Sequence, residues 1–254
     1  MTLVISSALD GAALRLCIDH GKGNVIDSRL VAALDEAFAR AQNETRLRCV
    51  LLEAAGKDFS FGASVEEHRP QAAPAMLEGL HRLIGRMLTT PLPLLAAVRG
   101  RCLGGGLELV LAASRVFAHP TARFACPEVK LGVFAPAASA LLPHRIGVTA
   151  SEDLLVTGRT IDAAEAHRLG LVQDVCAEAA DPADAALAWA KASLFELSRA
   201  STRYAVRAAR TWVPAALRRL FELEQLYTTE LMHTPDAQEG IDAFLSRRNA
   251  RWSS

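Results

Sequence analysis

Two glutamates and two glycine-containing segments are the residues of this 254-residue chain whose types and spacing could do chemistry. Segment 56–63 (GKDFSFGA) follows an apolar run, and the triple glycine at 104–106 opens a helical pattern. Bare glycines let a ligand approach the backbone closely, and a helix start leaves its first N–H groups unpaired and partly positive. Two such donors directed at one carbonyl oxygen would form an oxyanion hole.

Glu108 lies in the first turn of the helix that the glycines open, and Glu128 follows twenty positions later, directly after Pro127. Two carboxylates can divide the proton transfers on one water molecule. Taken singly, each feature has an ordinary interpretation: a tight turn, an acid that favours the helix dipole, or a solvated acid at a strand end. Together they favour catalysis, and the crowding predicts that one glutamate has a raised pKa and stays protonated near neutrality.

The elements that must position these groups alternate between strands and helices. Apolar runs and amphipathic patterns predict strands at 12–18, 47–54, 94–99, 116–118 and 123–125, and helices at 28–42, 74–88 and 107–113. This alternation predicts an α/β fold with crossover connections. Beyond residue 181 only helices are predicted, at 183–197, 199–212, 214–233 and 235–249. Their broad apolar faces need the core or another subunit to cover them.

Composition excludes several classes of function. The 28 basic and 28 acidic residues balance, so no long-range attraction to nucleic acid is expected. No apolar run reaches the roughly 18–20 residues of a membrane span, and no basic residue precedes the first apolar stretch as in a secretory signal. The five cysteines form no CxxC pair, which predicts a reducing, cytoplasmic setting. The seven histidines lack metal-ligand spacing, so no metal is expected. Ser60 and Ser64 lie outside any Gly-x-Ser-x-Gly elbow, which disfavours a serine nucleophile.

The order of the motifs resembles the crotonase (enoyl-CoA hydratase/isomerase) superfamily over almost the whole chain. The motifs are those at 59–63, 104–108, 127–132, 157–159, 163–166, 169–172 and 239–245. The resemblance implies a core of repeated ββα spiral turns that carries the CoA-thioester site (1–190), and a C-terminal helical region that forms trimers, usually paired into hexamers (191–254). It also implies addition of water to an α,β-unsaturated acyl-CoA thioester, with no separate cofactor. The backbone N–H groups of Ala63 and Gly105 would hold the thioester oxygen, and Glu108 and Glu128 would transfer protons.

Departures from the family pattern point to the acyl group. The first donor loop, which usually ends glycine-alanine-aspartate, ends here in Ser64, and the usual proline-glycine-x-glycine-glycine segment reads Pro-Ala-Ala-Ser-Ala at 136–140. We expect a compact acyl pocket lined by Phe61, Ser64, Val65, Phe134 and Ala137. These features resemble the cyclic dienoyl-CoA hydratases of anaerobic aromatic degradation, which convert cyclohexa-1,5-diene-1-carbonyl-CoA to 6-hydroxycyclohex-1-ene-1-carbonyl-CoA. A linear short-chain 2-enoyl-CoA hydratase and a non-catalytic CoA-ester-binding paralogue remain alternatives, although paired glutamates disfavour the second.

Overall fold

A six-stranded sheet forms the centre of the computed structural model, which describes residues 2–253. Its strand order is β1-β2-β3-β4-β6-β9, and only the β1–β2 pair is antiparallel. The strands are β1 (Leu3–Ala8), β2 (Ala13–Ile18), β3 (Cys49–Ala54), β4 (Leu94–Val98), β6 (Arg115–Ala118) and β9 (Asp174–Val175). The parallel strands require crossover connections, as the alternating sequence pattern predicts.

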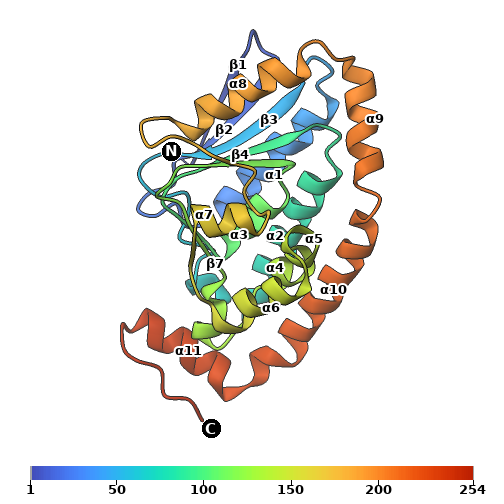
Figure 1. Cartoon of the computed structure of the whole chain (residues 1–254). Helices are drawn as coiled ribbons and strands as arrows, with labels where there is room; N and C mark the ends of the chain where they lie inside the picture. The colour runs from blue at the N-terminus through green and yellow to red at the C-terminus, as the bar shows by residue number, and fades with distance from the viewer. Residues whose placement is uncertain (1, 254) are drawn as a thin grey trace.

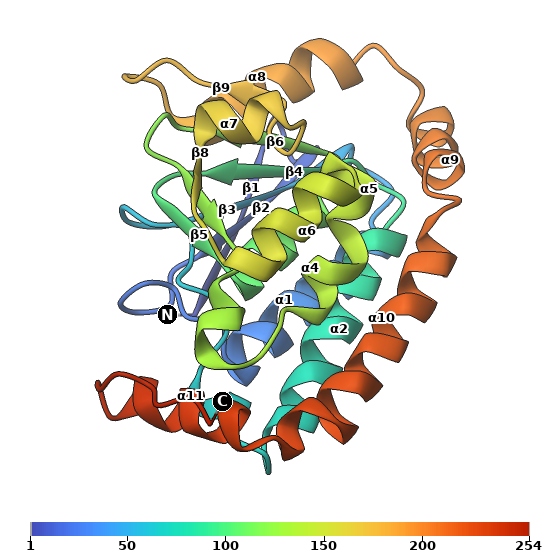
Figure 2. The same cartoon turned by 60° about the horizontal axis from the view of Figure 1, so that its bottom comes forward.

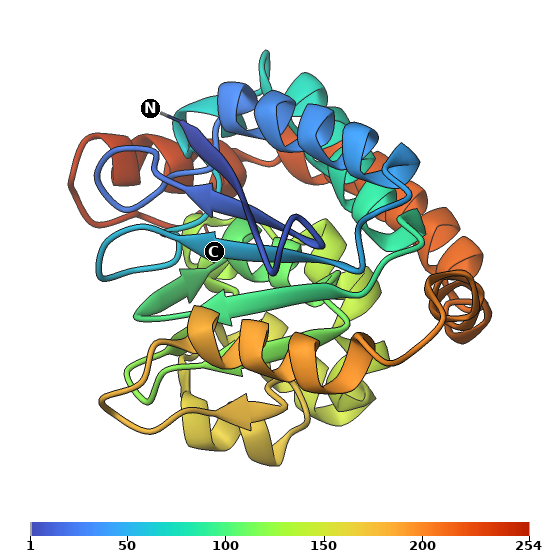
Figure 3. The same cartoon turned by 90° about the horizontal axis from the view of Figure 1, so that it is seen from above.

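Helices cover both faces of this sheet (Figure 3). Val50 and Leu52 of β3 point to a core shared with α1 (Ser28–Asn43) and α2 (Ala73–Thr89). Cys49 and Leu51 point the other way, into a smaller cluster with α8 (Pro182–Leu194). Because successive side chains of a strand face opposite sides, burial of both faces explains why β3 is a continuous apolar run.

A second sheet turns the chain into a spiral. It contains β5 (Arg101–Leu103), β7 (Arg123–Ala125) and β8 (Ile161–Asp162). Strand β4 leads directly into β5, and β6 leads directly into β7, so each turn gives one strand to each sheet. Helix α3 (Gly105–Leu111) follows the first pair, and η2 (Pro127–Leu131) and α4 (Pro136–Leu141) follow the second. The structure therefore confirms the predicted ββα spiral.

Helices α9 (Arg199–Ala209), α10 (Val213–Thr229) and α11 (Pro235–Leu245) follow one side and the base of the molecule (Figures 1 and 2). The remaining helices are α5 (Pro143–Ile146), α6 (Val148–Thr157) and α7 (Ala163–Arg168), with short turns η1 (Glu66–His68) and η3 (Leu231–His233). Helix α10 packs along α2 and α4, whereas every residue of α9 is exposed or half-buried. The predicted division after residue 190 falls inside α8, which covers the main sheet.

Several short elements escaped prediction, and one helix was misplaced. The helix expected at 107–113 begins at Gly105 and ends at Leu111, so the second and third glycines belong to the helix itself. Strand β5 has only three residues, and its pairing with β7 rather than its own pattern fixes it. Within residues 2–253, no helix combines the length and the apolar character needed to cross a membrane.

Candidate active site

Three successive turns of the spiral lie side by side at the candidate site. The Ser60 N–H donates to the carbonyl of Arg101 at 2.9 Å, and the Leu103 N–H donates back to the carbonyl of Ser60 at 3.0 Å. One residue further along, the Gly104 N–H donates to the carbonyl of Ala125 at 2.9 Å. In each of the three turns, the segment that carries a site residue follows soon after these paired residues. The spiral thus brings the donor segments and Glu128 together although they are about 65 positions apart in sequence.

Each of the three glycines makes room for a different neighbour. Gly104 adopts a φ of +48°, which disfavours other residues, and a Cβ there would collide with Oε1 of Glu128. A Cβ on Gly105 would lie 3.1 Å from the Ala63 nitrogen, and one on Gly106 would lie 2.7 Å from Cβ of Ser60. Glycine is therefore required for the three turns to touch.

The backbone of Gly105 consequently lies close to the Ala63 nitrogen. Within residues 2–253, neither N–H group donates a hydrogen bond to another part of the chain. Gly105 is also the first residue of α3, so its N–H lies at the positive end of a helix. Two such groups can hold one oxyanion.

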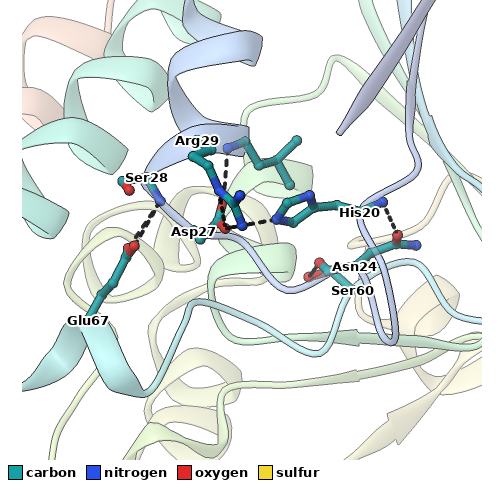
Figure 4. Close-up of polar contacts among 8 residues, drawn as sticks. His20, Asn24, Asp27, Ser28, Arg29, Ser60 and Glu67 are labelled. Atoms are coloured by element: carbon teal, nitrogen blue, oxygen red, sulfur yellow. Dashed lines mark hydrogen bonds and ion pairs between the residues drawn. The ribbon is translucent and has the colours of Figure 1, made fainter. Parts of the chain in front are cut away.

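Hydrogen bonds fix the first donor loop to the segment before α1. The Ser60 hydroxyl donates to the carbonyl of Asn24 at 2.8 Å and accepts from the Gly62 N–H at 3.0 Å. Figure 4 shows Ser60 beside Asn24, and His20 turned toward Asp27, which it contacts at 2.9 Å. The Ser60 hydroxyl is thus engaged with backbone groups, and within residues 2–253 no histidine is hydrogen-bonded to it. That Ser60 is not a nucleophile stays a prediction.

Glu108 is buried, with 3% of its surface exposed, and interacts with two other elements. Its Oε1 accepts a hydrogen bond of 2.9 Å from the Ala138 N–H at the start of α4. His81 of α2 is also buried, and its Nδ1 donates to Oε2 of Glu224 on α10 at 2.5 Å. Burial raises the pKa of Glu108, whereas His81 and the N–H groups of Ala138 and Ala137 act to lower it.

Fewer neighbouring groups stabilise a negative charge on Glu128 than on Glu108. Its Oε2 is enclosed and has no hydrogen-bond partner within residues 2–253. Burial, and then the charge of Glu108, raises the pKa of Glu128 to about 8. Glu108 has an N–H donor and a nearby imidazole, so Glu108 takes the negative charge and Glu128 keeps the proton at neutral pH. The pair can therefore supply one base and one acid.

Three of the predicted pocket residues belong to, or pack against, the buried clusters that contain residues of α4 and α10. Val65 and Phe134 pack against a cluster that contains Met76 and Tyr227, and the Phe134 ring meets the Tyr227 ring edge-on at 5.4 Å. Ala137 is fully buried next to the Ala138 N–H that holds Glu108. These residues form an apolar wall on the α4 and α10 side.

Phe61 and Ser64 lie on another side of the donor loop. The Phe61 ring is close to Gly23 and lies 4.9 Å from the guanidinium of Arg101. The Ser64 N–H donates to the carbonyl of Ile26, and its carbonyl accepts from Nδ1 of His68. That all five residues line one acyl pocket stays a prediction. Gly23 leaves space for the Phe61 ring.

A cavity of about 120 Å³ opens beside the first donor. It lies between α1 and α2, and Ala63, Ile26, Met76 and Leu80 are among the residues that line it. Ala63 and Met76 connect this cavity to both the donor loop and the apolar wall.

Sequence reasoning missed His81, Glu224 and Tyr227, and it considered Ala138 for the shape of the pocket but not for the hydrogen bond of its N–H to Glu108. His81, Glu224 and Tyr227 belong to no motif, and they come together through packing of α2 and α10. The available signal was weak: His81 and Tyr227 occupy buried positions in helical patterns that are otherwise apolar.

Comparison with known proteins decides the family. The sequence profile described as enoyl-CoA hydratase/isomerase matches residues 16–254. The chain belongs to the enoyl-CoA hydratase/isomerase family. It is 50% identical to a cyclohexa-1,5-dienecarbonyl-CoA hydratase of Thauera aromatica, over 96% of this chain and 94% of that protein. It is 33% identical to a probable enoyl-CoA hydratase of Mycobacterium bovis, over 89% and 88% of the two chains.

Solved structures agree on the fold. The chain matches an enoyl-CoA hydratase of Bacillus halodurans with a TM-score of 0.87 at 24% identity, covering 96% of this chain and all of that one. A putative enoyl-CoA hydratase/isomerase of Acinetobacter baumannii gives 0.82 at 26% identity, over 92% and 98%. The crotonase fold and family expected from the motifs are thus confirmed. As a family member of the hydratase type, this enzyme acts on an unsaturated acyl-CoA thioester.

Proposed function

We propose that this enzyme hydrates cyclohexa-1,5-diene-1-carbonyl-CoA to 6-hydroxycyclohex-1-ene-1-carbonyl-CoA, a step in anaerobic aromatic degradation. The observation that carries hydration is the pair of unequal glutamates beside two free backbone N–H groups. The relative from Thauera aromatica, half identical along nearly the whole chain, supports the cyclic acyl group.

The bond changes of this reaction need an acid and a base at different places. If the water oxygen bonds to the ring carbon β to the thioester carbonyl, electrons move through the ring diene onto the thioester oxygen. The product is then reached by protonation of the carbon directly across the ring, with a new double bond beside the carbonyl-bearing carbon. One group must therefore take a proton from water, and another must deliver a proton to the opposite ring carbon.

The two glutamates match these roles. Glu108, held as a carboxylate by the Ala138 N–H, accepts the proton from water. Glu128, with its pKa raised to about 8, is protonated at neutral pH and donates to the ring. The N–H groups of Ala63 and Gly105 stabilise the negative oxygen that forms between these events. One donor of this kind contributes about 2.7–4 kcal/mol to lowering a barrier.

The proposal includes no cofactor beyond the CoA of the substrate and no metal. General acid–base transfer and two backbone donors account for every bond change written above. Within residues 2–253, no group of three or more His, Cys, Asp or Glu residues is placed to hold a metal ion. We expect the enzyme to work in the cytoplasm, with its cysteines reduced, and with neither nucleic acid nor membrane as a partner.

We also propose that the C-terminal helices assemble a trimer or a pair of trimers. Large apolar side chains remain exposed on α10 and α11, among them Phe221 at 62% and Phe244 at 54%. Soluble monomers seldom leave several such side chains in contact with water along adjacent helices. Other copies of this chain would cover them.

Turnover of two thioesters tests the proposed activity. Wild-type enzyme is expected to hydrate cyclohexa-1,5-diene-1-carbonyl-CoA faster than crotonyl-CoA, with product identified by mass and NMR. Faster hydration of crotonyl-CoA would instead assign a linear 2-enoyl-CoA hydratase. Binding of both thioesters without turnover would assign a non-catalytic CoA-ester-binding protein.

A further inference from the structure

Tyr227 carries a buried hydroxyl group that the acid–base chemistry above does not use. Among residues 2–253 it is the largest side chain that is fully buried, and its hydroxyl has no hydrogen-bond partner there. A buried hydroxyl left unpaired costs stability, whereas phenylalanine at the same place would avoid that cost. A tyrosine at this position therefore calls for an explanation.

The hydroxyl lies in the same buried region as the two glutamates. The Tyr227 ring packs on Phe134, six residues after Glu128, and in one cluster with Val133, whose N–H donates to the Glu128 carbonyl at 3.2 Å. Burial raises the pKa of Tyr227, and the charges of Glu128 and Glu108 raise it further. The contacts through Phe134 and Val133 thus place the Tyr227 side chain against the segment that follows Glu128, and its hydroxyl bonds to neither carboxyl group.

A second enclosed polar atom belongs to the same region. Oε2 of Glu128 also has no hydrogen-bond partner within residues 2–253. Two enclosed polar atoms in one region that do not bond to each other can both form hydrogen bonds with one small polar group placed between them. A buried water or hydroxyl group is typically held by two to four such partners.

We propose that the Tyr227 hydroxyl is a third hydrogen-bond partner, beside Glu108 and Glu128, for the oxygen atom that is added to the substrate. This inference rests on the hydratase function proposed above. Tyr227 would hold the water before attack and the new hydroxyl group of the product after it. Tyr227 keeps its own proton throughout: the proton lost by water goes to Glu108, the C–O bond forms at the β-carbon, and Glu128 protonates the ring.

Substitution by phenylalanine removes only the hydroxyl group. Because a hydrogen bond to a charged or strongly polarised group is worth about 1.5–3 kcal/mol, Tyr227→Phe is expected to lower kcat by about 10- to 100-fold. Its thermal midpoint should equal or exceed that of the wild type, because an unpaired buried hydroxyl is gone. A hydroxyl with only a structural role would give the opposite pattern, with lower thermal stability and unchanged kcat.

The other tyrosine of the chain provides the matched control. Tyr204 on α9 is 68% exposed, and Tyr204→Phe should leave kcat and the thermal midpoint unchanged. If Tyr227→Phe turns over the thioester within twofold of wild type, Tyr227 does not hold the reacting oxygen. If wild-type enzyme hydrates neither the cyclic diene nor crotonyl-CoA, the proposed function itself fails.

A binding measurement tests the same inference without relying on a variant. Wild-type enzyme should bind 6-hydroxycyclohex-1-ene-1-carbonyl-CoA more tightly than cyclohex-1-ene-1-carbonyl-CoA, which lacks the hydroxyl group. Tyr227→Phe should reduce this preference by about tenfold or more, with little change for the unhydroxylated thioester. Equal affinity of the wild type for the two thioesters would overturn the inference.

Discussion

The protonated state of Glu128 should affect the free energy of unfolding as well as the activity. The pKa of Glu128 is about 8 in the folded protein, against an ordinary value of 4.5. Between these two pH values the folded chain keeps a proton that the unfolded chain releases, so the free energy of unfolding falls as pH rises. The slope approaches about 1.4 kcal/mol per pH unit, which gives a loss of about 4 kcal/mol across the interval.

Glu128→Gln replaces the protonated carboxyl by a neutral group of the same shape. The variant should be about as stable as wild type near pH 5 and more stable by a few kcal/mol at pH 8.5, because it has no carboxyl to ionise. Glu108 is present in both proteins, so the difference between them reports Glu128 together with its coupling to Glu108. At pH 7 the variant should lose about 10²-fold or more in turnover, because it can no longer donate a proton.

Urea unfolding at pH 5, 6.5 and 8.5 measures this difference, with protein concentration held constant because assembly would add to stability. Glu196→Gln, at an exposed position in the turn between α8 and α9, controls for the substitution itself. If Glu128→Gln and wild type differ by the same amount at all three pH values, Glu128 does not carry the extra proton, and the assignment of acid and base is wrong.

Three further predictions concern the other parts of the protein. Glu108→Gln should lower kcat by about 10²-fold or more and leave KM for the CoA thioester largely unchanged, because the oxyanion donors are backbone groups; near-normal kcat in a stopped-flow hydration assay would remove Glu108 from the mechanism. Wild type should hardly hydrate decenoyl-CoA, and Phe134→Ala should raise kcat/KM for this substrate. Phe61→Ala should change this selectivity less, because the Phe61 ring lies against Gly23 and Arg101. Equal effects of the two variants in competition assays would contradict the placement of the apolar wall. Sedimentation at micromolar concentration should show a trimer or a hexamer, and a compact monomer would contradict the role proposed for the exposed faces of α10 and α11.

The reacting residues of the site could be predicted because each belongs to a local feature of the sequence. The triple glycine, Glu108 in the first helical turn and Glu128 after Pro127 are each defined by neighbouring residues. Strand β3 and helices α1, α2 and α8 follow from apolar runs and helical periodicity, because burial repeats with the geometry of the backbone. The spiral and the family followed from the order of motifs.

What the sequence could not decide is which distant groups meet at the site. The Ala138 N–H that holds Glu108, the His81–Glu224 pair and the Tyr227 hydroxyl all come from helices whose own patterns specify only an apolar face. Which glutamate keeps the proton depends on these partners, because charge in a buried site is set by the donors and cations around it. The separation of Phe61 from Phe134 likewise arises from packing, since Gly23 accepts one ring and Tyr227 the other. Local pattern determined the elements and the reacting residues of this enzyme, and the contacts among α2, α4 and α10 determined their protonation and surroundings.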